Sequence, residues 1–438
     1  MKKSVLISSA LAMLLVFSCE KAGNHGEEPD NGNGGDVPQI SYQNRQKRSG
    51  KRGVSFNFSQ FPAEDCAALG SSASWSYNWG HSVPSGDLEQ HLTKNDIEYV
   101  QMIWNGNYNA DAIRTYKGLH PESEYILAFN EPNLTDQANM TPEQAAAFWP
   151  DIKNLANELG MKIISPAMNY GTLAGYHDPI KWLDEFFAQP GVSLEDVDGI
   201  AIHCYMNSPS GVQGFVKMFE KYGKPIWLTE FCAGTGSVSE ATQMAYMSEM
   251  FNYLEQSDLV ERYAWFMPRG SFNSRWNNAL LTTVNPFTNT SIELTPLGVV
   301  YANMSTFDKS LYYAEGEIVP AEHYSAMSGK FSIAPATDPV GGLLQVYGLN
   351  QGGWAEYQVE LATSGTYILE IRYSSFINVD VSLSCDGGDA MVVTLENSGD
   401  RWITKEIEVG LQEGKHVLKL SSQDGYSATY NYFRLRKK

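Results

Sequence analysis

The chain is 438 residues long and 43% of its residues are hydrophobic, which is enough for two globular domains with sizeable cores. Its formal net charge of −19 argues against nucleic-acid binding and against anionic substrates, because both would be repelled. The chain carries 24 Tyr, 19 Phe and 10 Trp, and aromatic faces are the usual surfaces on which sugar rings stack. Composition therefore favours a neutral partner.

The first residues predict export and lipid anchoring. Two lysines precede the run VLISSALAMLLVF, which is too short to span a bilayer as a stable helix and has the form of a signal peptide. The run ends in VFSC, which resembles a bacterial lipobox, so we expect a signal peptide over residues 1–18 and lipidation of Cys19. Ordinary secretory cleavage near Ser18 is the alternative. The expected location is the outer membrane, the cell surface or the periplasm, with the lipid anchor as the membrane contact.

Residues 19–50 contain the run EKAGNHGEEPDNGNGGD, which is rich in Gly, Asn and acidic residues and has no large hydrophobic side chain. Such a composition predicts a flexible tether. We expect the basic cluster at its end, NRQKRSGKR, to be solvated.

Residues 51–310 alternate short apolar runs with amphipathic helices. The clearest helix has Thr141 as its N-cap, Gln144 as its capping-box partner, and Gly160 as its closing residue. Eight strand–helix repeats with continuously apolar strands predict an α/β fold, a parallel sheet closed into a (β/α)8 TIM barrel. A doubly wound sheet is the alternative, but no Gly-rich phosphate loop follows any strand. The predicted strands cover residues 52–58, 72–80, 97–104, 125–132, 162–168, 198–205, 225–231 and 262–268.

Residues 311–438 change to a period of two. Runs such as WAEYQVEL, GTYILEIRYS and KHVLKLSS alternate apolar and polar residues, and turns with Gly and Asp separate them. The pattern predicts an all-β antiparallel sandwich of jelly-roll type as a second domain.

The run ILAFNEPN places Asn130 and Glu131 at the end of the fourth predicted strand, where Pro132 forbids the strand to continue. A solvated turn is one interpretation of that carboxylate. The other depends on the barrel, in which residues at the carboxyl ends of strands carry function. The other strand ends supply aromatic, imidazole and carboxylate side chains: Trp75, Tyr77, Trp79, Trp104, His203, Tyr205, Glu230 and Trp265.

Two carboxylates across one pocket, ringed by aromatic side chains, fit glycoside hydrolysis. One carboxyl group protonates the leaving oxygen, and the other attacks the anomeric carbon as an anion. Taken alone, Glu230 could be a buried structural acid, and each tryptophan could be a packing residue. His203 alone fits a residue that supports the carboxylates without contacting substrate. Their joint occurrence favours Glu131 and Glu230 as the catalytic pair, with the other strand-end side chains as the substrate-binding surface.

The cysteines indicate neither a metal site nor a redox site. Cys66, Cys204, Cys232 and Cys385 lack CxxC spacing. We therefore expect no metal and no cofactor, and the sequence assigns no disulfide.

Five motifs together resemble glycoside hydrolase family 128, the endo-β-1,3-glucanases of the retaining clan: KRGVSFN, SWSYNWG, FNEPN, AIHCY and WLTEF. The resemblance implies that Glu131 is the acid/base and Glu230 the nucleophile. It also implies that Asn130 hydrogen-bonds the sugar 2-hydroxyl, that Tyr205 orients the nucleophile, and that Trp265 floors the reacting subsite. The run PRGSFNSRWNNALLTTVNPFT has no match in the family pattern, which leaves subsite number and endo or exo action open.

The C-terminal part resembles carbohydrate-binding module family 6 through AEHY, GGWAEYQVELATSGTYILEIRYSS and YNYFRL. That resemblance implies that Tyr347 and Trp402 sandwich a sugar. The chain departs from the family pattern at Thr429 and Asn431, where the family has a ligand-binding Asn and an Asp. It departs again at Pro320, which replaces an acid of the family's calcium site. A sandwich that only packs against the barrel is the alternative.

The sequence thus predicts a monomeric, lipid-anchored retaining hydrolase whose partner is β-1,3-glucan, as polysaccharide or oligosaccharide. A surface glycan-binding lipoprotein without catalysis is an alternative, which the presence of both glutamates disfavours. A clan relative that cuts another β-glycan, such as β-1,6-glucan, xylan or mannan, is also open.

Overall fold

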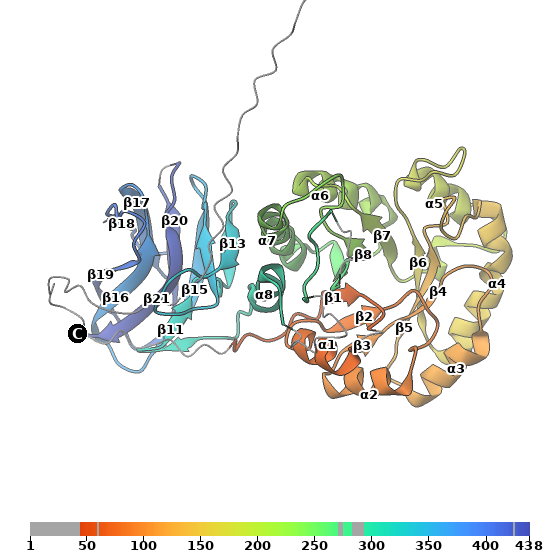
Figure 1. Cartoon of the computed structure of the whole chain (residues 1–438), viewed down its shortest axis with the longest axis horizontal. Helices are drawn as coiled ribbons and strands as arrows, with labels where there is room; N and C mark the ends of the chain where they lie inside the picture. Colours follow the sequence, from red (N-terminus) through yellow and green to blue (C-terminus); the bar gives the residue numbers. More distant parts are fainter. Residues whose placement is uncertain (1–43, 59–60, 270–274, 283–292, 424) are drawn as a thin grey trace, which may run out of the picture. The chain divides into compact units, whose positions relative to one another are not determined.

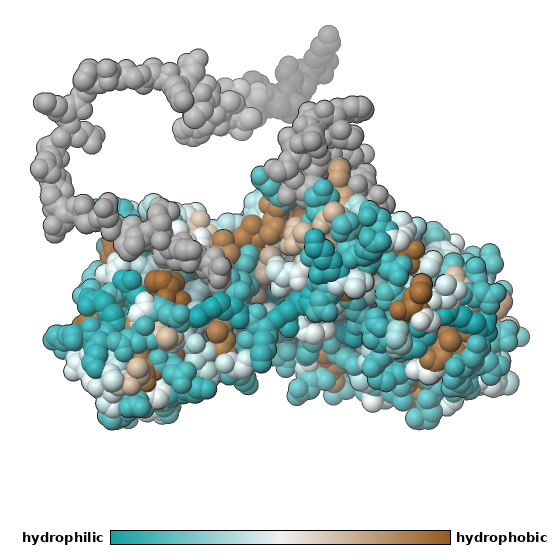
Figure 2. Space-filling model, turned by 90° about the horizontal axis from the view of Figure 1, so that it is seen from below, coloured by the Kyte–Doolittle hydropathy of each residue, from teal (hydrophilic) through white to brown (hydrophobic). Residues whose placement is uncertain are grey.

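The computed structural model describes residues 44–438 except residues 59–60, 270–274, 283–292 and 424 (Figure 1). The predicted signal peptide, the predicted lipidation site Cys19 and tether residues 19–43 lie outside the described residues. None of the helices in the described part combines the length and the apolar character that a bilayer crossing requires. Figure 2 shows a face that is mainly hydrophilic, with hydrophobic residues in small patches.

The N-terminal half of the described chain is built from parallel strands that follow one another in chain order. They are β1 (Arg52–Ser55), β2 (Trp75–Tyr77), β3 (Glu98–Tyr99), β4 (Gln101–Ile103), β5 (Tyr125–Asn130), β6 (Lys162–Ala167), β7 (Ile200–Cys204), β8 (Ile226–Phe231) and β9 (Val260–Trp265). One sheet has the order β3-β2-β1-β9-β8-β7 and the other β4-β5-β6, so the first and last strands are neighbours. Parallel bridges from Ile164 to Gly199 and from Met168 to Ile202 join β6 to β7. The predicted (β/α)8 arrangement is confirmed, and the third predicted strand is divided at Val100.

Helices alternate with these strands (Figure 1). Helix α4 (Pro142–Leu159) is capped as predicted: the Gln144 N–H donates to the Thr141 hydroxyl, the Thr141 N–H donates to the Gln144 side chain, and Gly160 ends the helix at φ 62°. The other helices are α1 (Pro62–Leu69), α2 (Gly86–Lys94), α3 (Ala110–Leu119), α5 (Pro179–Phe187), α6 (Pro209–Met218), α7 (Glu240–Gln256) and α8 (Pro296–Asn303), with short 3-10 helices at Leu194–Asp196 and Phe219–Tyr222.

Side chains along each strand alternate between the barrel interior and the layer of helices. The larger hydrophobic core contains the outward-facing set, including Phe231 and Trp265. This alternation decides which strand-end residues reach the mouth of the barrel. The interior cluster is Trp75, Tyr77, Val100, Met102, Tyr125, Leu127, Ile164, Ala167, Ala201, Trp227 and Ala264.

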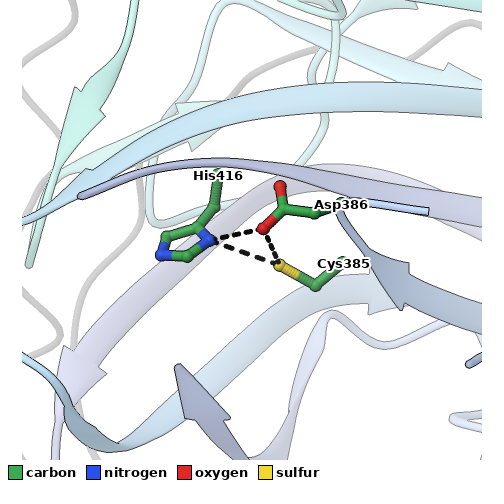
Figure 3. Close-up of side chains that lie close together, drawn as sticks. All are labelled: Cys385, Asp386 and His416. Carbon is green, nitrogen blue, oxygen red and sulfur yellow. Dashed lines mark hydrogen bonds and ion pairs between the residues drawn. The ribbon is translucent and has the colours of Figure 1, made fainter. Parts of the chain in front are cut away.

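The C-terminal part is the predicted antiparallel sandwich. Its strands are β10 (Tyr313–Ala314), β11 (Ile318–Pro320), β12 (Ala326–Ser328), β13 (Ser332–Pro335), β14 (Leu344–Tyr347), β15 (Trp354–Leu361), β16 (Gly365–Ser374), β17 (Val379–Cys385), β18 (Met391–Leu395), β19 (Ile403–Leu411), β20 (Gly414–Ser422) and β21 (Thr429–Lys437). One sheet has the order β10-β15-β20-β17-β18 and the other β13-β14-β21-β16-β19. Neighbouring strands are antiparallel except β10 and β15, which are parallel. The turn after β17 brings Asp386 beside His416 of β20 (Figure 3).

The basic cluster NRQKRSGKR is solvated only in part: Arg45 and Lys47 are exposed as predicted, but Arg48 is half-buried and Arg52 is buried, so the prediction is wrong for these two residues. Arg45 pairs with Glu317 at 2.9 Å, and the Lys47 N–H donates to Asp308 at 2.8 Å. Arg48 donates to four backbone carbonyl groups: those of Gly70, Ala73, Asn95 and Asp96.

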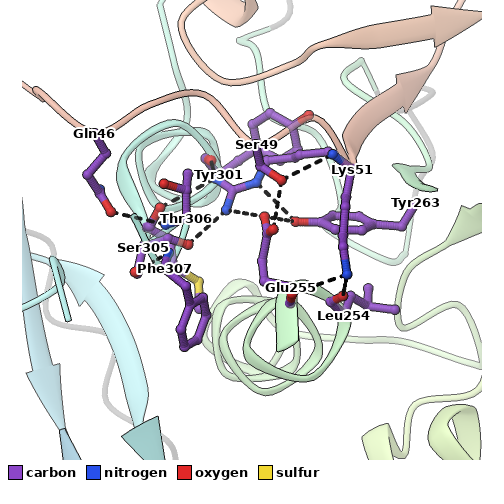
Figure 4. A network of polar contacts seen from close by, with 12 residues as sticks. Gln46, Ser49, Lys51, Leu254, Glu255, Tyr263, Tyr301, Ser305, Thr306 and Phe307 are labelled. Atoms are coloured by element: carbon purple, nitrogen blue, oxygen red, sulfur yellow. Dashed lines mark hydrogen bonds and ion pairs between the residues drawn. The ribbon is translucent and has the colours of Figure 1, made fainter. Parts of the chain in front are cut away.

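Arg52, at the end of this cluster, is fully buried in β1. Its Nη2 lies 2.9 Å from Glu255 Oε1, and its Nε donates to the Tyr263 hydroxyl at 3.1 Å. Figure 4 labels Glu255 and Tyr263 within the surrounding network of polar contacts. The carbonyl groups of Tyr301 and Ser305 accept two more hydrogen bonds, each at 3.0 Å. The guanidinium therefore ties β1 and β9 to α7 and to the end of α8.

Helix α7 also contacts the sandwich. The Tyr324 hydroxyl donates to Asn252 Oδ1 at 2.6 Å, and the Ile333 N–H donates to the Ser248 hydroxyl at 3.0 Å. Both hydrogen bonds are buried. The sandwich thus has a packing role, which does not exclude a binding role.

Candidate active site

Glu131 directly follows β5, and its backbone has the left-handed φ of 45°. A residue other than glycine rarely adopts this conformation. Pro132 has no N–H to donate, so the chain cannot continue as a paired β-strand. The Glu131 N–H donates to the carbonyl group of Ala167 at 3.1 Å, which holds the turn against β6. The residue is only 6% exposed, so the solvated-turn interpretation of this carboxylate is wrong.

Three hydrogen-bond donors hold the Glu230 carboxylate, which lies in β8. The Tyr77 hydroxyl donates to Oε1 at 2.9 Å and the Trp79 indole donates to the same oxygen at 2.7 Å. The Tyr205 hydroxyl donates to Oε2. Three donors on two oxygens fix the orientation of this carboxylate.

His203, in β7, lies between the two carboxylates and is fully buried. Its Nδ1 is 3.0 Å from Glu131 Oε1 and 3.5 Å from Glu230 Oε2. Both oxygens are acceptors, so Nδ1 carries a proton. These two oxygens can be no farther apart than the sum of the two distances, about 6.5 Å, which favours the short separation of retaining glycosidases.

The pKa values of Glu131 and His203 shift in opposite directions. Burial would raise the pKa of Glu131, but the charge of His203 and hydrogen bonds from His203 and Asn169 outweigh it, so this pKa lies below its ordinary value. Burial would lower the pKa of His203, but the charge of Glu230, together with Glu131, raises it above the ordinary value. In the free site the pair therefore shares one proton, held mainly on the imidazole.

Burial, followed by the charge of Glu230, raises the pKa values of Tyr77 and Tyr205 well above the ordinary value of tyrosine. Both phenols therefore stay protonated and remain donors to the carboxylate. Tyr205 is thus placed as predicted to orient Glu230.

The structure contradicts a substrate-binding role for Trp75. Its side chain is fully buried in the barrel interior, and its indole donates to the carbonyl group of Lys51 at 3.0 Å, next to the start of β1. The parallel strand therefore points this residue to the end of the barrel opposite the mouth. Trp75 stacks on Tyr77 from below, with ring centroids 6.1 Å apart.

The structure also contradicts Trp265 as the floor of a subsite. Trp265 is fully buried, packs edge-on against Phe231 and Phe251, and donates to the carbonyl group of Asn278 at 2.8 Å. Its side chain faces the helix layer, because the neighbouring Ala264 faces the interior.

Phe266 takes the place that was predicted for Trp265. Its ring centroid lies 6.1 Å from that of Trp79 and 5.4 Å from that of Tyr205, and Trp276 lies 5.7 Å from Tyr205. All four side chains are half-buried, so they form a partly exposed aromatic wall beside Glu230. Trp276 lies in the run without a family match, and only its spacing after the eighth strand could have indicated it.

Hydrogen bonds hold two amide side chains near the carboxylates, those of Asn130 and Asn169. Asn130 is 3% exposed, and its Nδ2 donates to Gln137 Oε1 at 3.1 Å, while its backbone N–H donates to the carbonyl group of Trp104. Asn169 donates to Glu131 Oε1 at 3.1 Å. Asn169 was not among the predicted site residues, although its position one residue after the fifth predicted strand was a usable signal.

A hollow of about 460 Å³ lies beside the carboxylates rather than at them. It borders the segment that follows Trp104 and the loop that precedes α4, and Phe148 and Met140 supply its apolar wall.

The two predicted sugar-binding aromatics of the sandwich are both half-buried, and two strands separate them. Tyr347 ends β14, Trp402 precedes β19, and β21 and β16 lie between these strands. The Trp402 indole donates to the Thr337 hydroxyl at 3.2 Å. Asn431 is buried and donates to Asp338 at 2.9 Å, so it serves the loop between β13 and β14.

Comparisons with known proteins agree with this geometry. Residues 53–301, more than half of the chain, match the family model described as Glycosyl hydrolase catalytic core. The solved structure of a GH128 (subgroup II) endo-β-1,3-glucanase from Pseudomonas viridiflava is 34% identical, covers 58% of this chain and 98% of its own, and has a TM-score of 0.52. The chain belongs to glycoside hydrolase family 128.

Two further proteins are similar to this chain. A family 128 (subgroup II) endo-β-1,3-glucanase from Sorangium cellulosum is 31% identical, with coverage of 57% of this chain and 97% of that one and a TM-score of 0.49. Alkali-sensitive linkage protein 1 of Schizosaccharomyces pombe is 26% identical over 251 residues, which are 54% of this chain. The chain spans 42% of that curated relative's length.

Residues 320–437 match Carbohydrate binding module (family 6), so the predicted resemblance is confirmed for both parts of the chain. This family 128 glycoside hydrolase thus carries a carbohydrate-binding module after its catalytic core. Among the described residues, one group of at least three His, Cys, Asp or Glu side chains could hold a metal ion, and it lies in this module: Cys385, Asp386 and His416.

Proposed function

We propose that this family 128 enzyme cleaves β-1,3-glucan with retention of configuration, using Glu131 as acid/base and Glu230 as nucleophile. The observation that carries the proposal is the buried pair of carboxylates joined through His203 Nδ1, at 3.0 and 3.5 Å. The similar enzyme from Pseudomonas viridiflava is an endo-β-1,3-glucanase, which supports β-1,3-glucan as the substrate.

The residues around the pair fit the two steps of this reaction. In the first, Glu230 attacks the anomeric carbon while the glycosidic bond breaks, and Glu131 passes the proton that it shares with His203 to the leaving oxygen. In the second, water attacks the glycosyl ester, Glu131 takes its proton, and the Glu230 carboxylate is restored. Tyr77, Trp79 and Tyr205 hold Glu230 in one orientation throughout.

A substrate panel with a reducing-sugar readout tests this proposal. We expect hydrolysis of laminarin and much slower hydrolysis of β-1,6-glucan, xylan and mannan. Proton NMR of the first product should show the β-anomer, and an α-anomer would contradict a covalent intermediate. Binding of laminarin without hydrolysis would favour a surface glycan-binding protein instead.

Replacing His203 tests how the shared proton is used. In the wild type, the last proton leaves the Glu131–His203 pair at the raised pKa of His203. In His203→Gln the last proton lies on Glu131, whose carboxyl group loses it at lower pH. We therefore expect the alkaline limb of the kcat/KM profile to move to lower pH. An unchanged or higher limb would contradict the shared proton.

We further propose that the enzyme is a monomeric lipoprotein of the bacterial envelope, anchored through Cys19. The run VFSC after a short apolar segment supports this location. In Cys19→Ser the protein should move from the membrane fraction to the soluble fraction with full activity on laminarin, as fractionation and immunoblotting would measure. Membrane association that persists in this variant would argue against lipidation at Cys19.

The module is proposed to hold the polymer through Tyr347 and Trp402. A stacked aromatic contributes about 1 kcal/mol, so Trp402→Ala and Tyr347→Ala should each lower activity on insoluble β-1,3-glucan several-fold. Activity on short soluble oligosaccharides should not change. Phe376→Ala is the matched control, because this exposed aromatic of the same module is 69% exposed. Equal losses in the control and the two variants would count against the binding role.

A further inference from the structure

Three side chains with metal-ligating atoms converge in the carbohydrate-binding module. Cys385 ends β17, Asp386 lies in the following turn, and His416 lies in β20, which pairs with β17 (Figure 3). His416 Nδ1 is 2.7 Å from Asp386 Oδ2 and 3.7 Å from Cys385 Sγ, and Sγ is 3.5 Å from the same carboxylate oxygen. One sulfur, one nitrogen and one oxygen thus face a common point.

The groups behind these atoms hold them in the orientation that a metal needs. His416 Nε2 lies 2.8 Å from the carbonyl oxygen of Gln412, which can only accept, so Nε2 carries a proton. In the neutral ring, Nδ1 then has its lone pair free for a ligand. Asp386 Oδ1 accepts from the Val417 N–H at 2.8 Å, which leaves Oδ2 to face the cluster. Supporting hydrogen bonds of this kind are typical of metal sites.

The turn that carries Asp386 is also fixed. Asp386 has φ 51° and Gly387 has φ 71°, and the Gly388 N–H donates to the carbonyl group of Cys385 at 2.9 Å. The Asp386 N–H donates to the carbonyl group of Val417 at 2.9 Å. A tight Asp-Gly turn hydrogen-bonded to β20 therefore places two of the three ligands.

Two of the three distances between these atoms match a tetrahedral zinc ion. Zinc bonds of about 2.3 Å to sulfur and about 2.0 Å to nitrogen and oxygen place sulfur about 3.5 Å from each lighter ligand. The observed distances from Cys385 Sγ are 3.5 and 3.7 Å. The nitrogen and oxygen would need to separate from 2.7 Å to about 3.3 Å, which a half-exposed Asp386 side chain allows.

We propose that Cys385, Asp386 and His416 form a binding site for a divalent transition metal, with zinc as the ion that fits best. A thiolate, an imidazole and a carboxylate are ligands for zinc, whereas calcium and magnesium prefer oxygen atoms alone. The fourth position would hold water. Binding replaces the thiol proton of Cys385, and the imidazole proton at Nδ1 if the ring is charged, and releases them to solvent.

The bound metal would link the turn after β17 to β20. In the folded chain the metal would add its bonds to the hydrogen bonds between this turn and β20. The unfolded chain would not hold the three ligands together and would not bind the metal. Zinc should therefore raise the melting temperature of the module. This inference does not depend on the catalytic proposal, because none of the three residues contacts the barrel carboxylates.

Cobalt(II) absorption spectroscopy on the full-length chain tests the site. The wild type should bind one cobalt ion with a thiolate-to-metal charge-transfer band and the visible bands of tetrahedral cobalt, and added zinc should remove both. Cys385→Ser should lose the charge-transfer band, and His416→Gln should weaken binding by at least about 100-fold. Cys66, Cys204 and Cys232 remain in these variants as buried internal controls.

Two more variants keep the test decisive. Asp386→Asn tolerates the same backbone conformation and keeps the acceptor for Val417, so it should fold and weaken zinc binding by about 10-fold or more. Asp389→Asn changes an exposed acid of the same turn and should bind zinc like the wild type. A wild type without the charge-transfer band, a band that persists in Cys385→Ser, or equal losses in the two aspartate variants would overturn the proposal.

Discussion

Glu230→Gln should abolish hydrolysis of β-1,3-glucan, with a loss in kcat of at least about 10⁴-fold. The amide cannot form the glycosyl ester, and it would also disturb the two donors that meet Glu230 Oε1, Tyr77 and Trp79. Initial rates on laminarin, measured by reducing-sugar release, are the readout. Turnover near that of the wild type would show that the nucleophile has been assigned wrongly.

Glu131→Gln should slow the enzyme on polysaccharide by about 10²- to 10⁴-fold, because the leaving oxygen then receives no proton. Activated aryl glycosides should be spared in the first step, since their leaving groups need little protonation. This difference separates the acid/base from the nucleophile.

Glu261→Gln is the matched control for both glutamate variants. Glu261 accepts from the Trp227 indole at 3.0 Å and belongs to β9, away from the mouth. Glutamine keeps an acceptor oxygen for that indole, so activity should stay close to that of the wild type. Equal losses in all three variants would indicate damage to the barrel rather than to its chemistry.

Arg52→Ala should have the largest effect on stability. It would leave the Glu255 carboxylate buried with a side-chain exposure of 4% and would remove the donors to three backbone carbonyl groups. Breaking a buried ion pair in this way lowers the free energy of unfolding by about 3–5 kcal/mol. Urea unfolding followed by tryptophan fluorescence and circular dichroism measures this change.

Arg45→Ala provides the comparison within the same basic cluster. Arg45 and Glu317 also pair at 2.9 Å, but their side chains are 40% and 39% exposed. Such a pair contributes about 0–1 kcal/mol, because water and salt screen it. Similar losses in the two variants would mean that burial does not decide the contribution of Arg52.

The sequence by itself determined the order of the elements and the ends of several of them. Thr141, Gln144 and Gly160 set the limits of α4 because capping joins side chains to backbone groups within one turn. Pro132 ends β5 for an equally local reason, since it has no N–H to donate. The positions of Glu131 and Glu230 followed from strand ends in a parallel barrel, which chain order alone predicts.

Tertiary structure alone decided which aromatic side chains reach the mouth. Trp265 faces the helices while Phe266 lies beside Trp79, and Trp75 fills the interior near the opposite end. A strand has a period of two, so an uncertainty of one residue in its register reverses the face of every side chain.

Long-range pairing decided the rest. Arg52 meets Glu255 across 203 residues, and Asp386 meets His416 across 30 residues, through contacts that no local spacing reveals. The sequence therefore predicted a solvated basic cluster at residues 44–52, and it gave no sign of a metal site at Cys385. Their partners come from α7 in one case and from the pairing of β17 with β20 in the other, and only folding brings those partners within bonding distance.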